Sequence, residues 1–201
     1  MLNNQVKLIG TVSSNFTYDH SVREDDFYKF YLSIERKSGF IDVIPVIVSS
    51  KIFNITEDIT ESAVEIRGSF KSFNENSLNG RKVILYVFAK SIKFTVECDY
   101  NEVILYGYLC RKPVYRETPL GRQLTDTCIA VNRFVGKSDY LPAIFWGNNA
   151  IDVGGYATGT HIKIIGRLQS RAYNKYVDDI KETRIAYEVS AKDVEVIIEQ
   201  I

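Results

Sequence analysis

Two stretches of the sequence decide the fold, because the second repeats the first. Asn4–Gly10 reads NQVKLIG, and Asn101–Gly107 reads NEVILYG, from Gly10 to Gly107 an offset of 97 residues. Both stretches are rich in residues that favour strands, and both place a glycine within the predicted strand. A glycine there is typical of a small barrel, in which a strand must bend sharply or form a bulge. The sequence therefore predicts two copies of one small β-domain.

Further segments repeat in the same order and at nearly the same offset. They are Ile34–Arg36 with Val131–Arg133, Asp42–Pro45 with Asp139–Pro142, Val64–Gly68 with Ile162–Gly166, and Ala89–Lys93 with Ala191–Glu195. The few added residues fall between predicted strands, where insertions are tolerated. We expect two domains, residues 1–97 and 98–201, because 201 residues are enough for two separate cores.

The sequence predicts five strands in each half, with a short helix after the third strand. In the first half the predicted strands are Val6–Val12, Phe27–Ile34, Ile41–Val48, Val64–Phe70 and Val83–Phe94. One helix is predicted in each half, within Lys51–Thr60 and within Asn148–Ala157. One long loop is predicted in each half, at Asn74–Gly80 and at Arg171–Lys181. This order predicts an all-β chain of two tandem OB-folds, which are five-stranded Greek-key barrels with a short helix between strands 3 and 4. A β-sandwich of similar size is the main alternative, and the central helix favours the OB-fold.

Charge and cysteine content narrow the possible functions. The 25 Lys and Arg residues balance 25 Asp and Glu residues, so a nucleic-acid surface must arise from local charge. The three cysteines lack CxxC spacing and the two histidines lie far apart, so we expect no metal site, disulfide framework or cofactor. Paired carboxylates at metal spacing, a Ser/His/Asp arrangement and a phosphate-binding glycine loop are all missing, which predicts a protein without catalytic residues. Without a signal peptide or a run of roughly 18 apolar residues, we expect a cytoplasmic protein.

The second half carries a series of motifs in one order. They are Gly107–Leu109, Lys112–Pro113, Tyr115–Arg122, Ala130–Arg133, Asp139–Gly147, Gly166–Arg171 and Thr183–Val189. With these motifs it resembles the bacterial single-stranded DNA-binding protein family. The resemblance implies sequence-independent binding and protection of single-stranded DNA in replication, recombination or repair, and assemblies that present four OB-folds. A chain with two OB-folds would then be a homodimer, associated with the nucleoid through DNA.

Four aromatic residues of the second half are candidates for base stacking. Tyr140 and Trp146 are six residues apart on one predicted strand, so alternation places them on the same side of the sheet. The resemblance implies that Tyr140, Trp146 and Tyr173 occupy stacking positions, and that Phe134 approximates another. A place in the barrel core is the alternative for each of them.

Cations interleave with these aromatic residues in the second half. Single-strand binding needs such cations for the phosphates and aromatic faces for the bases. The candidates for phosphate contacts are Arg111, Arg116, Arg122, Arg133, Arg167, Arg171 and Lys175. Arginine suits this role because it can pair with a phosphate and also lie flat on a base. Solvated surface charge is the alternative for each.

The first half departs from this pattern. Val43, Ser49 and Glu75 stand where the repeat places Tyr140, Trp146 and Tyr173 in the second half. Other aromatic residues and a lysine are present instead, at Phe16, Tyr18, Phe40, Phe73 and Lys71. Two expectations remain open: the first OB-fold binds DNA weakly through these residues, or it mainly supports dimerisation.

The end of the sequence bears on partners. Members of the family that this chain resembles usually carry a flexible linker and an acidic C-terminal tip, which recruits repair and replication enzymes. This sequence stops at Ile201, directly after the last predicted strand. Either this branch of the family lacks the acidic recruiting tail or the sequence is cut short before it, and both alternatives put recruitment of replication and repair proteins by that route in doubt. An OB-fold adaptor that grips a protein of a replication or recombination complex is the second functional hypothesis.

Overall fold

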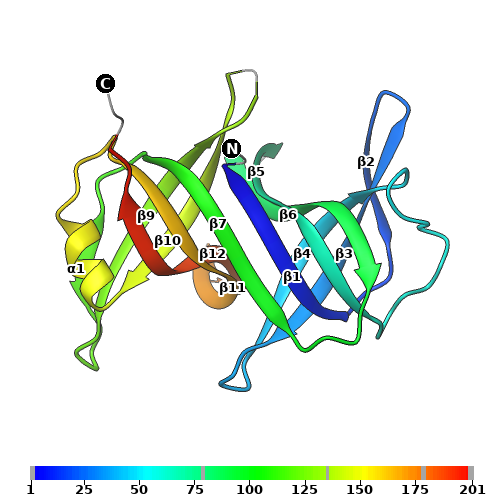
Figure 1. The fold of residues 1–201 in the computed structure, drawn as a ribbon, viewed down its shortest axis with the longest axis horizontal. Helices are drawn as coiled ribbons and strands as arrows, with labels where there is room; N and C mark the ends of the chain where they lie inside the picture. Colours follow the sequence, from blue (N-terminus) through cyan, green and yellow to red (C-terminus); the bar gives the residue numbers. More distant parts are fainter. Residues whose placement is uncertain (1–2, 78–79, 135, 178–179, 199–201) are drawn as a thin grey trace.

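The computed structural model describes residues 3–77, 80–134, 136–177 and 180–198, which form twelve strands, one short helix and the turns that connect them (Figure 1). The first half contains β1 (Asn4–Val12), β2 (Thr17–Val22), β3 (Asp25–Glu35), β4 (Ile41–Ser49), β5 (Ala63–Ser77) and β6 (Gly80–Phe94). The second half contains β7 (Tyr100–Leu109), β8 (Val114–Glu117), β9 (Gln123–Asn132), β10 (Ser138–Trp146), α1 (Asn148–Gly154), β11 (His161–Val177) and β12 (Ile180–Val196).

Both halves are closed barrels with the same strand pairing. In the first half β1 pairs with β5 on one side and with β3 on the other, while β4 and β6 run parallel. In the second half β7 pairs with β11 and β9, while β10 and β12 run parallel. The internal repeat therefore corresponds to a repeated OB-fold, and the prediction of two tandem OB-folds is confirmed.

The barrels bend at the repeated glycines. A Cβ atom on Gly10 would lie 2.4 Å from the carbonyl oxygen of Ser33, and one on Gly107 would lie 2.5 Å from that of Ala130. At each glycine the strand leaves the other barrel and begins to close its own: β1 pairs with β7 as far as Ile9 and with β3 from Thr11. Only glycine allows the two backbones to approach this closely.

The helix prediction is correct for the second half and wrong for the first. α1 follows β10 and buries Ala150 and Val153 against its barrel. Turns occupy Lys51–Thr60 instead of a helix. In those turns the Asn54 side chain accepts a hydrogen bond from the backbone of Thr56, and that of Asp58 accepts one from the backbone of Thr60. Such local side-chain bonds compete with helical hydrogen bonds.

The two predicted loops are wrong as well, because they belong to long hairpins. Pairing of β5 with β6 continues from the barrel out to Ser77 and Gly80, and that of β11 with β12 to Val177 and Ile180. The outer parts stand in solvent, so their composition is polar although their backbone is extended. Residues 78–79 and 178–179 of the predicted loops lie outside the described residues. The short edge strands β2 and β8 were not predicted, since both are exposed along their whole length and lack an alternating pattern.

The two barrels lie side by side and share one sheet (Figure 1). They meet where β1 pairs with β7 in antiparallel register, and in this register Val6 lies opposite Val103. These two residues are equivalent in the repeat, so an approximate twofold axis passes between them. β6 ends at Phe94 and β7 begins at Tyr100, and the division into domains at residues 97 and 98 remains a prediction.

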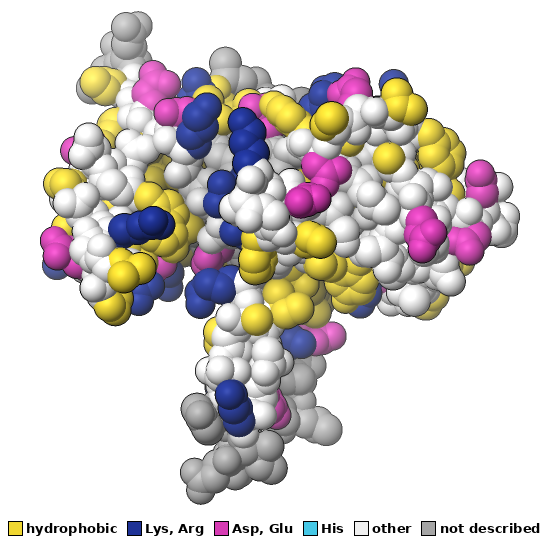
Figure 2. Space-filling model, turned by 90° about the horizontal axis from the view of Figure 1, so that it is seen from below, with side chains coloured by type: hydrophobic (Ala, Val, Ile, Leu, Met, Phe, Trp, Pro, Cys, Tyr) yellow, Lys and Arg dark blue, Asp and Glu magenta, His cyan; other side chains and the backbone are white. Residues whose placement is uncertain are grey.

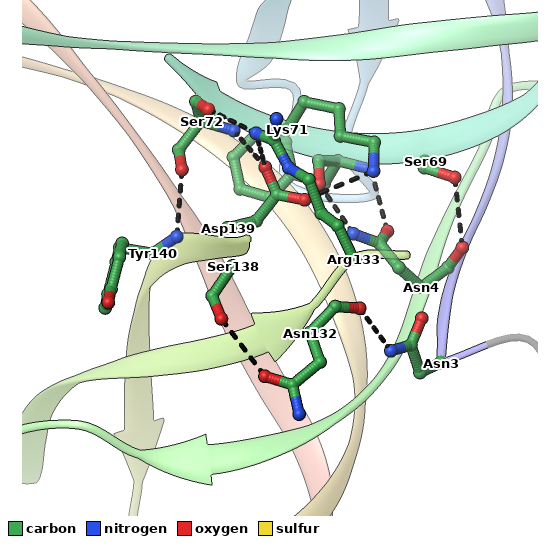
Figure 3. A network of polar contacts seen from close by, with 11 residues as sticks. Asn3, Asn4, Ser69, Lys71, Ser72, Asn132, Arg133, Ser138, Asp139 and Tyr140 are labelled. Carbon is green, nitrogen blue, oxygen red and sulfur yellow. Dashed lines mark hydrogen bonds and ion pairs between the residues drawn. The ribbon is translucent and has the colours of Figure 1, made fainter. Parts of the chain in front are cut away.

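A buried aspartate from each barrel holds the hairpin of the other. The Asp42 carboxylate accepts hydrogen bonds from Arg36 Nε at 2.6 Å and from the backbone N–H of Ser170 at 2.7 Å. At the equivalent place Asp139 accepts from Arg133 and from the backbone N–H of Ser72, the latter at 2.8 Å (Figure 3). Both carboxylates are fully buried.

The serine of each hairpin returns a contact to the other barrel. Ser170 Oγ accepts from the backbone N–H of Val43 at 3.1 Å, and Ser72 Oγ accepts from that of Tyr140 at 2.8 Å. Lys71 Nζ adds an ion pair to Asp139 at 3.2 Å, which has no counterpart at the equivalent Gln169. These reciprocal contacts, together with the β1–β7 pairing, fix the position of each hairpin against the neighbouring barrel.

Candidate nucleic-acid interface

The outer face of β10 presents two aromatic side chains. Leu141, Ala143 and Phe145 point into the barrel and are buried, whereas Tyr140 is 50% exposed and Trp146 is 38% exposed. The predicted alternation along this strand is therefore present. A place in the core is excluded for both residues, and their rings are available to a ligand.

The other two candidate aromatic side chains are also on the surface. Phe134 lies in the turn between β9 and β10 and is 94% exposed. Tyr173 lies on the outer part of β11 and is 38% exposed. Neither is a core residue.

Arg116 extends the β10 face across the sheet. It lies opposite Leu124 of β9, and Leu124 in turn lies opposite Trp146, so the three side chains share one face of the sheet. The Arg116 guanidinium pairs with Asp126 at 2.5 Å and is mostly exposed. Arg111, two residues after the end of β7, donates from Nη2 to the carbonyl oxygen of Thr127 at 3.2 Å.

Four candidates follow the same face of β11. Arg167, Arg171, Tyr173 and Lys175 occupy alternate positions of the strand, so their side chains point the same way. The opposite partner of Tyr173 on β12 is Arg184, a cation of the same face that the sequence analysis did not select. The Arg171 guanidinium is 3.5 Å from Glu188 and remains more than half exposed.

A groove of about 920 Å³ between the barrels brings part of the predicted set together. Four predicted residues line it, namely Arg122, Trp146, Arg167 and Arg171. Figure 2 shows Lys and Arg side chains gathered over the middle of one face, where the two barrels meet. Arg111, Arg116, Phe134, Tyr140, Tyr173 and Lys175 do not line this groove.

The groove also contains residues that the sequence analysis missed. They are the cations Arg36, Lys37 and Lys192 and the aromatic residue Tyr100, and beside them lies Phe40, which was named above among the aromatic residues of the first half. Arg36 is detectable in the sequence, because the repeat places it on Arg133. The others carry no signal, since only the packing of the two barrels brings them beside Trp146.

Arg167 experiences the charge of this groove directly. Partial burial lowers the pKa of its guanidinium, and the nearby Arg36 lowers the same pKa further. Asp42, the partner of Arg36, opposes this effect and raises the pKa of Arg167. Like charges that share a groove repel each other, and a bound anion relieves that repulsion. The electrostatics of the groove therefore favour a negatively charged ligand.

Arg133 has a different position from the other candidates. Its Nη2 donates to Asp139 and to the carbonyl oxygen of Ser72 at 2.5 Å, so it joins the two barrels (Figure 3). The hydrogen bond to Asp139 raises the pKa of the guanidinium above its ordinary value. Through these contacts Arg133 holds the β5–β6 hairpin of the first barrel against the second barrel.

No group of three or more His, Cys, Asp or Glu side chains is placed to hold a metal ion in the part of the chain that the structure describes. Within the same residues no helix has the length and apolar character needed to cross a membrane.

Comparison with known proteins gives a consistent picture. Residues 100–197 match the sequence model of the single-strand binding protein family. The single-stranded DNA-binding protein 2 of Streptococcus agalactiae serotype V is 37% identical over 83 residues, which are 38% of this chain and 63% of the relative. A Staphylococcus aureus single-stranded DNA-binding protein 1 is 35% identical over 80 residues, 36% of this chain and 48% of the relative. This chain thus spans less than two thirds of the length of these relatives, which are named for DNA binding and not for a reaction.

The similarity in three dimensions covers both barrels. The crystal structure of the wild-type single-stranded DNA binding protein from Thermus aquaticus superposes with a TM-score of 0.79 at 21% identity, over 98% of this chain and 94% of that one. A deletion mutant of the Thermus aquaticus protein gives a TM-score of 0.76 at 23% identity, over 98% of this chain and 96% of the other. At this level of identity the likeness shows the fold of the whole chain, including its first half.

Proposed function

We propose that this chain, whose residues 100–197 match the model of the single-strand binding protein family, is a member of that family and binds single-stranded DNA without sequence preference. One observation carries the proposal: Tyr140 and Trp146 lie exposed on the same face of β10, and Trp146 borders a groove lined with cations. Unpaired bases stack on aromatic faces of this kind, and every base offers such a face. Binding would therefore tolerate any sequence.

The other candidate residues have roles that follow from their positions. Arg111, Arg116, Arg122, Arg167, Arg171 and Lys175 contact phosphates, while Phe134 and Tyr173 offer further stacking surfaces. Each stacked base contributes about 1–3 kcal/mol, so a few such contacts give a stable complex. Arg133 acts indirectly, because it holds the hairpin of the first barrel against the loop that carries Phe134.

A fluorescence titration tests the proposal. Oligo(dT) added to the protein should quench the emission of Trp146, which is the single tryptophan of the chain. The affinity should fall as salt rises, because phosphate contacts release counterions. Unchanged emission together with the lack of a salt-sensitive complex would rule out the proposal and favour the protein adaptor.

The cellular role and the assembly follow as further parts of the proposal. Such a protein would protect single strands during replication, recombination or repair, and would accompany DNA in the cytoplasm. We propose a homodimer, since two chains of two OB-folds present the four that the family resemblance implies. Light scattering of the free protein checks this, and a monomeric mass at micromolar concentration would contradict it.

A further inference from the structure

Cations are concentrated in the groove between the barrels although the whole chain is neutral. The groove is lined by Arg36, Lys37, Arg122, Arg167, Arg171 and Lys192, and Glu102 is the only carboxylate among the lining residues that the structure describes. Charges of one sign on the walls of a cleft add to each other and attract the opposite charge. The groove is thus a local site for a polyanion.

Several of these cations are available to a ligand. Within the described residues, the side chains of Lys37, Arg122 and Lys192 make no hydrogen bond or ion pair. Arg36 differs, because Asp42 holds its guanidinium through two bonds of 2.6 and 2.5 Å. Arg171 likewise has a carboxylate partner, Glu188 at 3.5 Å. The groove therefore combines guanidinium groups held by carboxylates with cations from both barrels that have no partner among the described residues.

The turn between β3 and β4 contributes an aromatic platform from the first barrel. Phe40 is 50% exposed, and the guanidinium carbon of Arg36 lies 4.5 Å from the centre of its ring. Two backbone bonds of 2.8 Å close the turn, from Arg36 N–H to Phe40 and from Gly39 N–H to Arg36. Because Asp42 fixes Arg36 and the turn is closed, one face of the Phe40 ring is covered and the ring has a defined position.

Trp146 and Phe40 line the same groove from opposite barrels. We propose that a single strand of DNA stacked on Trp146 continues through the groove onto the first barrel, where Phe40 stacks a base and Lys37 contacts a phosphate. This inference rests on the proposed function and extends it to residues outside the part of the chain that matches the family. The first barrel then contributes through its β3–β4 turn, and not through the β4 face that corresponds to Tyr140 and Trp146.

A nucleic acid fits this groove better than other anions. The cations lie on β12, on β11, before β9 and in the turn of the first barrel, so a ligand with a repeating charge can meet several of them. The aromatic residues on both sides need a ligand with flat faces between its charges. A single strand has both features, whereas an acidic peptide supplies only the charge.

Oligonucleotides of two lengths separate this inference from the proposed function. Since one OB-fold occupies about 4–16 nucleotides, an oligo(dT) of about 8 nucleotides fills the Trp146 barrel and one of about 30 reaches the first barrel. Phe40→Ala should lower the affinity for the long oligomer about 5-fold or more, the effect of one lost stacking contact. It should leave the affinity for the short oligomer nearly unchanged.

Charge variants and matched controls complete the experiment. Lys37→Gln should lower the slope of log affinity against log salt by about 0.7 for the long oligomer, the loss of one phosphate contact on a single strand. Phe94→Ala and Lys90→Gln change an exposed aromatic residue and an exposed lysine of the same barrel outside the groove, and should have no such effects. Urea unfolding of every variant verifies that the fold is intact.

The outcomes are distinct. If Phe40→Ala and Lys37→Gln bind the long oligomer like the unchanged protein, the inference is wrong while the proposed function stands. If the unchanged protein binds neither oligomer, the proposed function itself fails. If a poly(Glu) peptide displaces the long oligomer and Phe40→Ala does not weaken that peptide, the groove is a site for an acidic protein segment and the inference is overturned.

Discussion

The two barrels share their strand pairing but differ on one outer face. In the second barrel that face of β10 exposes Tyr140 and Trp146. In the first barrel the corresponding face of β4 carries Val43, Ile47 and Ser49, and the latter two are buried. Ser49 Oγ donates to the Asp25 carboxylate at 2.6 Å, which occupies the hydroxyl.

The barrels also differ in charge near this face, and this difference too favours DNA binding by the second barrel. Asp25 of the first barrel stands at the position that the repeat assigns to Arg122 in the second. A carboxylate at that position repels a phosphate that Arg122 would attract. The comparison teaches that the buried face and the contacts between barrels specify the fold, while a few outward side chains decide which barrel offers a stacking surface.

The contacts between barrels should show the largest effect, and the same effect from both sides. Asp42→Ala and Asp139→Ala should each lower the free energy of unfolding by about 3 kcal/mol, because removal of one partner leaves a guanidinium and a backbone N–H without their acceptor. Urea unfolding followed by circular dichroism measures this. Asp193→Ala, which removes an exposed carboxylate, is the control and should change little. If only one of the two substitutions lowers the free energy of unfolding, the two aspartates are not equivalent in the stability of the protein.

Stacking residues should instead separate the two barrels. Tyr140→Ala and Trp146→Ala should each weaken oligo(dT) binding about 5- to 150-fold, the equivalent of 1–3 kcal/mol per base. Val43→Ala, at the position equivalent to Tyr140, should change the affinity less than about 2-fold. Fluorescence anisotropy of labelled oligo(dT) reports on all three, since it does not need Trp146. Comparable losses from Val43→Ala and Tyr140→Ala would mean that the β4 face binds DNA as well.

The smallest difference concerns acid stability. Hydrogen bonding from Arg67 at 2.7 Å keeps the pKa of Glu65 below its ordinary value of 4.5, whereas the equivalent residue of the second barrel is Lys163. A carboxylate with a lowered pKa stabilises the folded state above pH 4.5, and this contribution disappears as the pH falls through the folded-state pKa. Exposed ion pairs contribute about 0.2–1 kcal/mol in general.

Glu65→Gln tests this small effect. The variant should be slightly less stable than the unchanged protein near neutral pH, and the difference should vanish in acid. Urea unfolding as a function of pH gives the comparison, with the exposed Glu24→Gln of the same barrel as control. A difference that persists in acid would assign the effect to packing and not to charge.

Much of this protein was determined by the sequence alone. The repeat, read from segments such as Asn4–Gly10 and Asn101–Gly107, predicted two OB-folds correctly, because strand propensity and the glycines at the bends are local properties. Alternation along β10 predicted that Tyr140 and Trp146 share a face. The sequence did not predict the hairpins or the missing first helix, since polar composition does not distinguish an exposed ribbon from a loop and side-chain bonds of Asn54 and Asp58 replace helical ones.

Only the tertiary structure decided how the barrels act together. The bond between Asp42 and Ser170 joins residues 128 positions apart, and it forms because β1 pairs with β7. The same packing brings Lys37 and Phe40 to the groove that Trp146 lines, and it gives Arg133 a hydrogen bond to the carbonyl oxygen of Ser72 in the other barrel. No local pattern encodes these contacts, because they arise between surfaces that each barrel completes only after it has folded.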